Sequence, residues 1–320
     1  MSENIMDYRF LLAALGLVTC VQVAWADDSP AIQSKLNACY AGTGSCNIDF
    51  QGARKTIGAT LKVDPEYVTL RNAVFDCVMT SGTCLYVSEE GFPRARHPGS
   101  NRLEGLAVYG SKSIDGITMN YPGNDNVTNA ATTLFNISLQ GFNHGLVLGS
   151  GVWGADMHGV VIGNGNVGIY IPPDTKNAGE LSTFVSGTVY NNAVAGLDEE
   201  SNVELSFLGT RFDFNNQQML LSGPTSFSGH IENFQNGKPE IVLKALPGVP
   251  AGSIYMSPGT TITVDQWNAA SPQQPCYIQT SLPWNRIVVP ATLWGFGGTQ
   301  GAVCGPGKVV TWDRQAPDFQ

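Results

Sequence analysis

Short runs of β-branched and aromatic residues alternate with Gly, Asn, Asp and Ser along most of the chain. Examples are Thr60–Val63, Tyr67–Leu70 and Leu106–Tyr109. Apolar runs of this length, bounded by turn-forming residues, predict β-strands. No long helical pattern follows them, so the chain is expected to be an all-β protein.

One segment near the start has a helical pattern instead. Asp28-Ser29-Pro30 predicts the start of a short amphipathic helix, because Asp and Ser cap helices and Pro suits the first turn. Ala31, Leu36 and Ala38 are expected on its apolar side. The helix would precede the strands and cap them.

The strands repeat along the middle of the chain. Four of them begin with Gly and run into an apolar residue: Gly159–Ile162, Gly187–Tyr190, Gly209–Phe212 and Gly229–Ile231. The steps between these glycines are 28, 22 and 20 residues. A period of this size, without helices, predicts a solenoid in which each unit is one coil. A β-sandwich is the alternative; it explains the strands but not the repeat.

The two ends of the chain differ from the repeat. Phe10–Ala24 is mostly apolar and is followed by Trp25-Ala26, which resembles a signal peptide and its cleavage site. An uncleaved anchor is the alternative. We predict a signal peptide over residues 1–26, an N-terminal cap over 27–55, a parallel β-helix over 56–240, and terminal coils with an irregular cap over 241–320.

Six of the seven cysteines lie after the predicted signal peptide, an even number that suits an oxidising compartment. Proximity in the sequence favours three disulfides: Cys39–Cys46, Cys77–Cys84 and Cys276–Cys304. No spacing typical of a zinc site is present, so we expect no metal. The protein is therefore expected to be periplasmic or secreted.

The charge of the chain disfavours some classes of binding partner. Only 13% of residues are charged and the formal net charge is −9. Nucleic-acid binding needs clustered Lys and Arg, so a nucleic-acid partner is disfavoured. Stable membrane insertion is not expected once the signal peptide is removed. The sequence leaves open whether the protein forms a homo-oligomer.

Five short motifs carry a resemblance to a known superfamily. They are Gly168–Ile171, Gly179-Glu180, Thr188–Asn192, Arg211–Asn215 and Gly229–Asn233. In this order they resemble the right-handed parallel β-helix of the pectate-lyase-like superfamily, nearest to the β-helix segment of phage tailspikes and capsule depolymerases. The likeness spans roughly residues 100 to 235. It implies a glycan-facing groove and depolymerase activity, with a polysaccharide as partner.

Two carboxylates are the main candidates for chemistry. If Phe212 and Ile231 occupy equivalent places on successive coils, Asp213 and Glu232 lie on adjacent strands about 4.8 Å apart. Their carboxylates would then be roughly 5 to 8 Å apart, which covers both retaining and inverting glycosidases. Glu180, on the preceding coil, is a candidate third carboxylate. The alternative is that these are solvated coil positions, and the glycine register leaves one of them at a corner.

Further residues are candidates for binding substrate. Their side chains could stack on sugar rings or bond hydroxyls: Tyr170, Tyr190, Arg211, His230, Asp156 and His158. Arg211 shares strand parity with Asp213. A polysaccharide lyase or uronan epimerase with an Arg base therefore stays open, and Ca²⁺ is expected only in that case. The remaining alternative is a non-catalytic protein for glycan binding or for exopolysaccharide export or the matrix.

Overall fold

The computed structural model describes residues 26–42, 46–65, 67–89, 102–122, 132–232, 238–245, 252–257, 261–263, 276–290 and 303–312. The predicted signal peptide lies outside these residues except for Ala26. Within them, the chain forms one helix followed by strands in two sheets, in which all the strand pairs are parallel.

The larger sheet, sheet A, has thirteen strands in the described part of the chain. They are β1 (Cys46–Ile57), β3 (Val68–Cys77), β5 (Arg102–Tyr109), β7 (Thr133–Phe135), β8 (Ser138–Gln140), β10 (Asp156–Gly163), β12 (Thr183–Tyr190), β14 (Leu205–Asp213), β16 (Pro224–Glu232), β18 (Ser253–Met256), β19 (Thr261–Thr263), β21 (Arg286–Pro290) and β23 (Lys308–Trp312).

Sheet B has ten described strands. They are β2 (Leu61–Val63), β4 (Thr83–Val87), β6 (Asp115–Met119), β9 (His144–Leu148), β11 (Val167–Ile171), β13 (Ala195–Glu199), β15 (Met219–Leu221), β17 (Ile241–Leu243), β20 (Ile278–Thr280) and β22 (Val303–Cys304).

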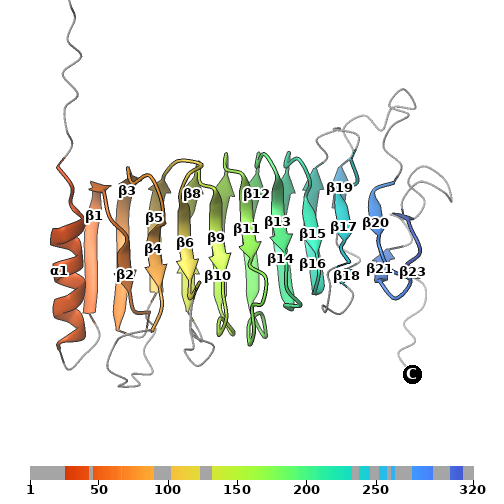
Figure 1. Cartoon of the computed structure of the whole chain (residues 1–320), viewed down its shortest axis with the longest axis horizontal. Coiled ribbons are helices and arrows are strands. Elements are labelled where there is room, and N and C mark those ends of the chain that lie inside the picture. Colours follow the sequence, from red (N-terminus) through yellow and green to blue (C-terminus); the bar gives the residue numbers. More distant parts are fainter. Residues whose placement is uncertain are drawn as a thin grey trace, which may run out of the picture.

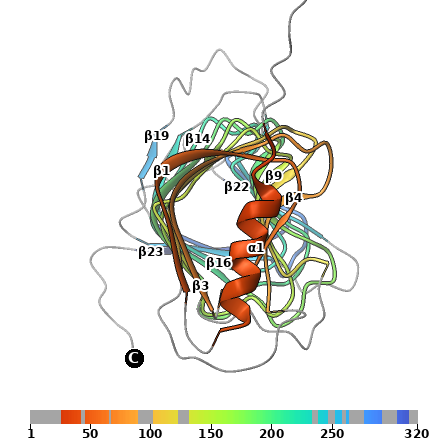
Figure 2. The ribbon, with the colours of Figure 1, turned by 90° about the vertical axis from the view of Figure 1, so that its left-hand side faces the viewer.

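The chain passes alternately through the two sheets, so each visit to both makes one coil. Figure 1 shows the strands stacked along the long axis, and Figure 2 shows them winding around one interior. This is the predicted parallel β-helix. A β-sandwich is excluded, because sandwiches are built from antiparallel sheets.

The interior is a stack of apolar side chains contributed by equivalent positions of successive coils. One buried stack through sheet A comprises Phe75, Val108, Leu139, Ile162, Val189, Phe212 and Ile231. Successive residues of a strand point to opposite faces, so the next residue of each strand faces outward. These residues form the outer column: Asp76, Tyr109, Gln140, Gly163, Tyr190, Asp213 and Glu232.

Most coils carry a kink near the middle of the sheet A segment. The kink residue has a positive φ in six successive coils: Asn72, Gly105, Asn136, Gly159, Ser186 and Gly209. β16 lacks it, and the pairing shifts there so that Gly229 lies beside Thr210. The glycines that define the sequence repeat are therefore not all equivalent. Gly159 and Gly209 are kink residues. Gly187 follows the kink residue of β12, which is Ser186, and Gly229 lies in β16, which has no kink.

The helix α1 (Ser29–Tyr40) covers the N-terminal end of the solenoid (Figures 1 and 2). Its buried apolar residues are Ile32, Leu36, Cys39 and Tyr40, a helical spacing that packs against the first coil. The predicted apolar side was wrong in two members, since Ala31 and Ala38 are exposed. The buried face of the helix includes Leu36, as predicted, but its other apolar members are the larger side chains of Ile32, Cys39 and Tyr40.

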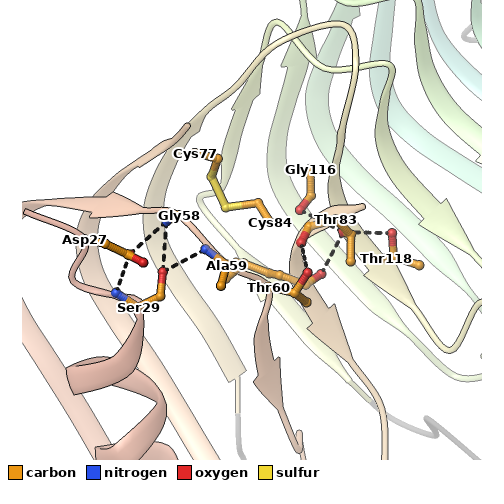
Figure 3. Close-up of a disulfide and its surroundings, with 11 residues drawn as sticks. Asp27, Ser29, Gly58, Ala59, Thr60, Cys77, Thr83, Cys84, Gly116 and Thr118 are labelled. Carbon is orange, nitrogen blue, oxygen red and sulfur yellow. Dashed lines mark hydrogen bonds between the residues drawn. A yellow bond between two sulfur atoms is a disulfide. The ribbon is translucent and has the colours of Figure 1, made fainter. Parts of the chain in front are cut away.

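The helix begins at Ser29 as predicted, with Asp28 at the N-cap and Pro30 in the first turn, but the capping bonds differ from the expectation. Asp28 makes no side-chain capping bond to the helix, and its carboxylate accepts a bond from the Thr56 N–H at 3.0 Å. The Asp27 carboxylate instead accepts bonds from the N–H groups of Ser29 and Gly58, each at 2.9 Å. The Ser29 hydroxyl accepts a bond from the Gly58 N–H at 2.9 Å (Figure 3). The cap is thus tied directly to the turn after β1.

The three predicted disulfides are present. Cys39–Cys46 joins α1 to β1, and Cys77–Cys84 joins the end of β3 to β4 (Figure 3). Cys276–Cys304 joins the segment before β20 to β22. In the part of the chain that the structure describes, no helix is long and apolar enough to cross a membrane.

Candidate functional site

Two carboxylates meet on the outer face of sheet A. Phe212 and Ile231 are buried partners in β14 and β16, which turns Asp213 and Glu232 outward as direct neighbours. Arg211 and His230 are paired in the same way, two residues earlier. The lost kink in β16 accounts for the different distances of the two carboxylates from their glycines, so neither lies at a corner.

The side chains of these four residues form a tight cluster, which we call the acidic cluster. His230 Nε2 lies 3.7 Å from Glu232 Oε2 and 4.0 Å from Asp213 Oδ1. Arg211 Nε lies 3.2 Å from Asp213 Oδ2. One oxygen from each carboxylate and the His230 nitrogen all lie within 4.8 Å of one another. This close approach of the oxygens suits the short carboxylate separation of retaining glycosidases, about 5 to 5.5 Å, better than the roughly 6.5 to 9.5 Å of inverting ones.

The two carboxylates have different surroundings. Asp213 is only 5% exposed, and burial raises the pKa of its carboxyl group, against the opposing effects of Arg211 and His230. Its Oδ1 atom is buried without a hydrogen-bond partner. Glu232 is more exposed than Asp213. Because burial disfavours the charged form, Asp213 is suited to hold a proton to higher pH than an ordinary Asp.

Tyr190 precedes Asp213 in the outer column and lies flat on the sheet. Its ring covers Gly163, where a Cβ atom would come within 2.5 Å of the ring. Its hydroxyl donates a hydrogen bond to Gln140 Oε1 at 3.0 Å and accepts one from Asn164 Nδ2 at 3.2 Å. The ring is thus held in place as a platform beside the acidic cluster, an arrangement suited to stacking on a sugar ring.

A polar cavity of about 370 Å³ begins one residue beyond Asp213. It is lined by Lys112, Asn164, Asn191, Asn192, Ala193, Phe214 and Asn216. Phe214 is exposed with a φ of 56°, which is rare for a bulky residue and often marks a functional site. Sequence reasoning missed this cavity. The Asn residues after successive strands were its main signal, and Phe214 was noted only as part of the motif Arg211–Asn215.

A small change beneath Tyr190 would test the platform. We expect Gly163→Ala to push the Tyr190 ring off the sheet, because the added methyl group would meet the ring, and so to weaken several-fold the binding of a sugar stacked there. The φ of Gly163 is not positive, so Ala fits the backbone. The Kd of a stacked sugar ligand measures the effect. Tyr190→Phe keeps the ring and is expected to change this Kd less; equal effects would contradict the role of the platform.

Glu180 does not join the acidic cluster, which corrects the expectation of a third carboxylate. It lies before Thr183, where β12 begins, whereas the β12 residue beside Asp213 is Tyr190, the last of the strand. Seven strand residues span roughly 20 Å. The coil was assigned correctly from the sequence, but the position of Glu180 along that coil was not.

Tyr170 lies on sheet B rather than beside the carboxylates of sheet A. It stacks on His144, with ring centroids 4.2 Å apart, and His144 Nδ1 lies 2.8 Å from Asp115 Oδ1. Burial and the nearby carboxylates, Glu200 first, raise the pKa of Tyr170 to about 12. The expected place of Tyr170 in the same groove as Asp213 is therefore wrong.

Asp156 and His158 also lie away from the acidic cluster. They are on β10 before the kink at Gly159, and the equivalent residues of β14 are Ser206 and Leu208. The His158 ring lies against Phe135. They share sheet A with the acidic cluster but belong to the other half of its strands.

The acidic cluster also has the donor atoms of a cation site. Two carboxylates and an imidazole suit a first-row transition ion better than Ca²⁺, which prefers six to eight oxygen ligands. The Nε2 and carboxylate oxygens would have to move closer together to bind one ion. The expectation that hydrolysis needs no metal stays a prediction, and so does Ca²⁺ in a lyase.

The fold and this cluster define a parallel β-helix protein with an acidic site on one face. No protein-family model matches the chain, and no curated protein sequence matches it.

Proposed function

We propose that the protein is an exported glycoside hydrolase that cleaves internal bonds of a bacterial exopolysaccharide. The observation that carries the proposal is the pairing of Asp213 with Glu232 on adjacent strands, with a buried carboxyl group of raised pKa in one of them. Glycoside hydrolysis needs one protonated and one ionised carboxyl group at this separation.

The surroundings of the two carboxylates indicate which one is the general acid and which one is the nucleophile. Asp213, with the raised pKa, is the general acid that protonates the glycosidic oxygen. Glu232 is the nucleophile that attacks the anomeric carbon, because it is the more exposed of the two. The leaving sugar departs with the proton, and a covalent glycosyl–Glu232 ester remains. Asp213, now ionised, takes a proton from water, which attacks the ester and restores both side chains.

The other members of the acidic cluster orient these groups. His230 lies between the two carboxylates and stabilises the negative charge that alternates between them. Arg211 faces the Oδ2 edge of Asp213 and is half-exposed, so the guanidinium group would have to move aside for substrate to reach the acid. Tyr190 and the cavity that Phe214 lines would bind sugars on one side of the bond that is cleaved.

The outer column supports a polymer as substrate rather than a single sugar. Tyr109 is exposed three coils before Tyr190, about 14 Å away along the solenoid. The three disulfides support export, since such bonds persist in oxidising compartments such as the periplasm.

Incubation of residues 27–320 with a panel of bacterial exopolysaccharides tests the proposal. The panel should include neutral, uronate-containing and N-acetylhexosamine-containing polymers. We expect new reducing ends without the ultraviolet absorbance of unsaturated uronates. Absorbance would favour a lyase, for which the half-exposed Arg211 beside Asp213 is the specific support. Binding with neither signal would favour a non-catalytic glycan-binding protein.

The stereochemistry of the product is a separate prediction. Since the carboxylate oxygens approach within 4.8 Å, we expect the first product to keep the anomeric configuration of the substrate. Proton NMR of the anomeric signals in the first minutes of cleavage measures this. An inverted product would show that a water molecule fits between the two carboxylates, and would rule out Glu232 as nucleophile.

A further inference from the structure

A second groove lies on the loops that lead from sheet B into sheet A. It has a volume of about 520 Å³. Its lining comes from three successive coils: Trp153, Thr175, Lys176, Asn177, Ala178, Glu180, Leu181, Asn202 and Val203. None of these residues belongs to the acidic cluster, and Glu180 is the only one that the sequence had marked.

The groove is held open by main-chain hydrogen bonds between neighbouring loops. The Gly154 N–H donates to the Glu180 carbonyl at 2.7 Å, and the Gly179 N–H donates to the Val152 carbonyl at 2.8 Å. The Gly151 N–H donates to the Lys176 carbonyl at 2.9 Å. The loops are thus fixed relative to one another before any ligand binds, which lowers the entropic cost of binding.

Two large apolar side chains of the groove lie exposed. Trp153 is 39% exposed, and Leu181 is 76% exposed with a φ of 57°. A β-turn position with this φ favours Gly or Asn, so the Leu side chain is displayed at a cost in backbone strain. Exposed apolar groups rimmed by polar ones mark binding surfaces.

The chemistry of the lining matches a carbohydrate. A sugar ring has an apolar face, which stacks on an indole, and an edge of hydroxyl groups, which bond to amides and charged groups. Asn177 and Asn202 supply amides, and Lys176 and Glu180 supply one charge of each sign. The groove therefore suits a sugar without net charge.

We propose that the groove lined by Trp153 is a second glycan-binding site, for neutral sugars of the polymer that the acidic cluster cleaves. This inference rests on the proposed function for the identity of the ligand. The groove opens at the start of β12, roughly 20 Å from the end of that strand beside Asp213. A polymer held at both places would bind more tightly than at either one.

Affinity electrophoresis through gels that contain each polymer of the panel tests the groove. Glu232→Gln serves as the parent, so that the polymer stays intact. We expect Trp153→Ala in this parent to weaken retardation about tenfold, as for loss of a central aromatic contact. Trp284→Ala is the matched control, because Trp284 is 66% exposed and lies outside both sites. Its retardation should equal that of the parent.

A second variant distinguishes a loss of binding from misfolding of Trp153→Ala. Leu181→Asn removes the apolar side chain and suits the positive φ, so it should keep the fold and still weaken retardation. The inference is overturned if Trp153→Ala and Leu181→Asn are retarded like the parent, if Trp284→Ala is weakened equally, or if no polymer retards the parent. Failure of the proposed function is separate: polymer would retard the parent through the groove, but the unmodified protein would release no reducing ends.

Discussion

Replacing Glu232 with Gln is expected to lower the rate of glycan cleavage at least a hundredfold, and Asp213→Asn should have a similar effect. General acid catalysis contributes about 10² to 10⁴ in rate, and without the nucleophile no covalent intermediate forms. Gln and Asn keep the size of each side chain but can neither attack the anomeric carbon nor donate an acidic proton. Measured kcat at saturating polymer shows the effect directly.

The two variants should differ in ways that separate their roles. In Glu232→Ala, a small anion such as azide can enter the space left by the carboxylate and restore turnover by attacking the anomeric carbon. In Asp213→Asn, a substrate with a good leaving group should restore the first step, because that group departs without a proton. The opposite pattern of rescue would exchange the two assignments.

The pH dependence follows from Asp213 as the acid. Burial raises the pKa of this group, so it keeps its proton to higher pH than an ordinary Asp. The value of kcat/KM should fall as pH rises through this raised pKa, because the acid is lost. Asp213→Asn should abolish that limb of the profile.

Asp156→Asn is the matched control for the carboxylate variants. It neutralises an exposed Asp of sheet A that lies before the kink, away from the acidic cluster. Activity should stay near that of the unmodified protein. Asp213→Asn and Glu232→Gln that each kept full activity would show that cleavage takes place elsewhere.

The free energy of unfolding is expected to fall by a few kcal/mol between about pH 5 and pH 8 because of Glu199. This side chain is fully buried at the end of β13, and burial raises its pKa to about 8. The backbone N–H groups of Val203, Ser222 and Gly223 donate to its two oxygens and oppose that shift. Lys244, which pairs with Asp198 and bonds the Glu199 carbonyl, opposes it further.

The sign follows from proton binding. Between the ordinary pKa of Glu in the unfolded chain and about 8 in the folded one, the folded protein binds the extra proton. Stability therefore falls as pH rises through this window and levels off above it. A shift of one pKa unit corresponds to about 1.4 kcal/mol of stability.

Urea denaturation at several pH values checks this, with Glu199→Gln as the test variant. The variant should be less stable at low pH, because the Gln amide N–H₂ faces backbone donors, but its stability should vary much less with pH. Some dependence should remain, since Asp213 also has a raised pKa and contributes with the same sign. Glu204→Gln, an exposed change nearby, should keep the full dependence. Equal slopes in both variants would exclude Glu199 as the cause.

Much of this protein could be predicted from local patterns in the chain. Apolar runs between turn residues predicted the strands, their repeat predicted the solenoid, and closeness in the sequence predicted the disulfides. Strand alternation was enough to turn Asp213 outward next to Phe212, and to put His230 and Glu232 on one face. These features depend on neighbouring residues, whose geometry the backbone sets.

Tertiary structure decided which residues of different coils meet. Coil length varies, and one missing kink residue in β16 brought Asp213 level with Glu232. Tyr170 and Glu180 have suitable chemistry, but hydrogen bonding between coils places them on sheet B and in the loop before β12. Trp153 and Phe214 face open cavities for the same reason. Alternation determines the face on which a side chain lies, whereas register between distant strands determines its neighbours, and register depends on the summed length of every loop between them.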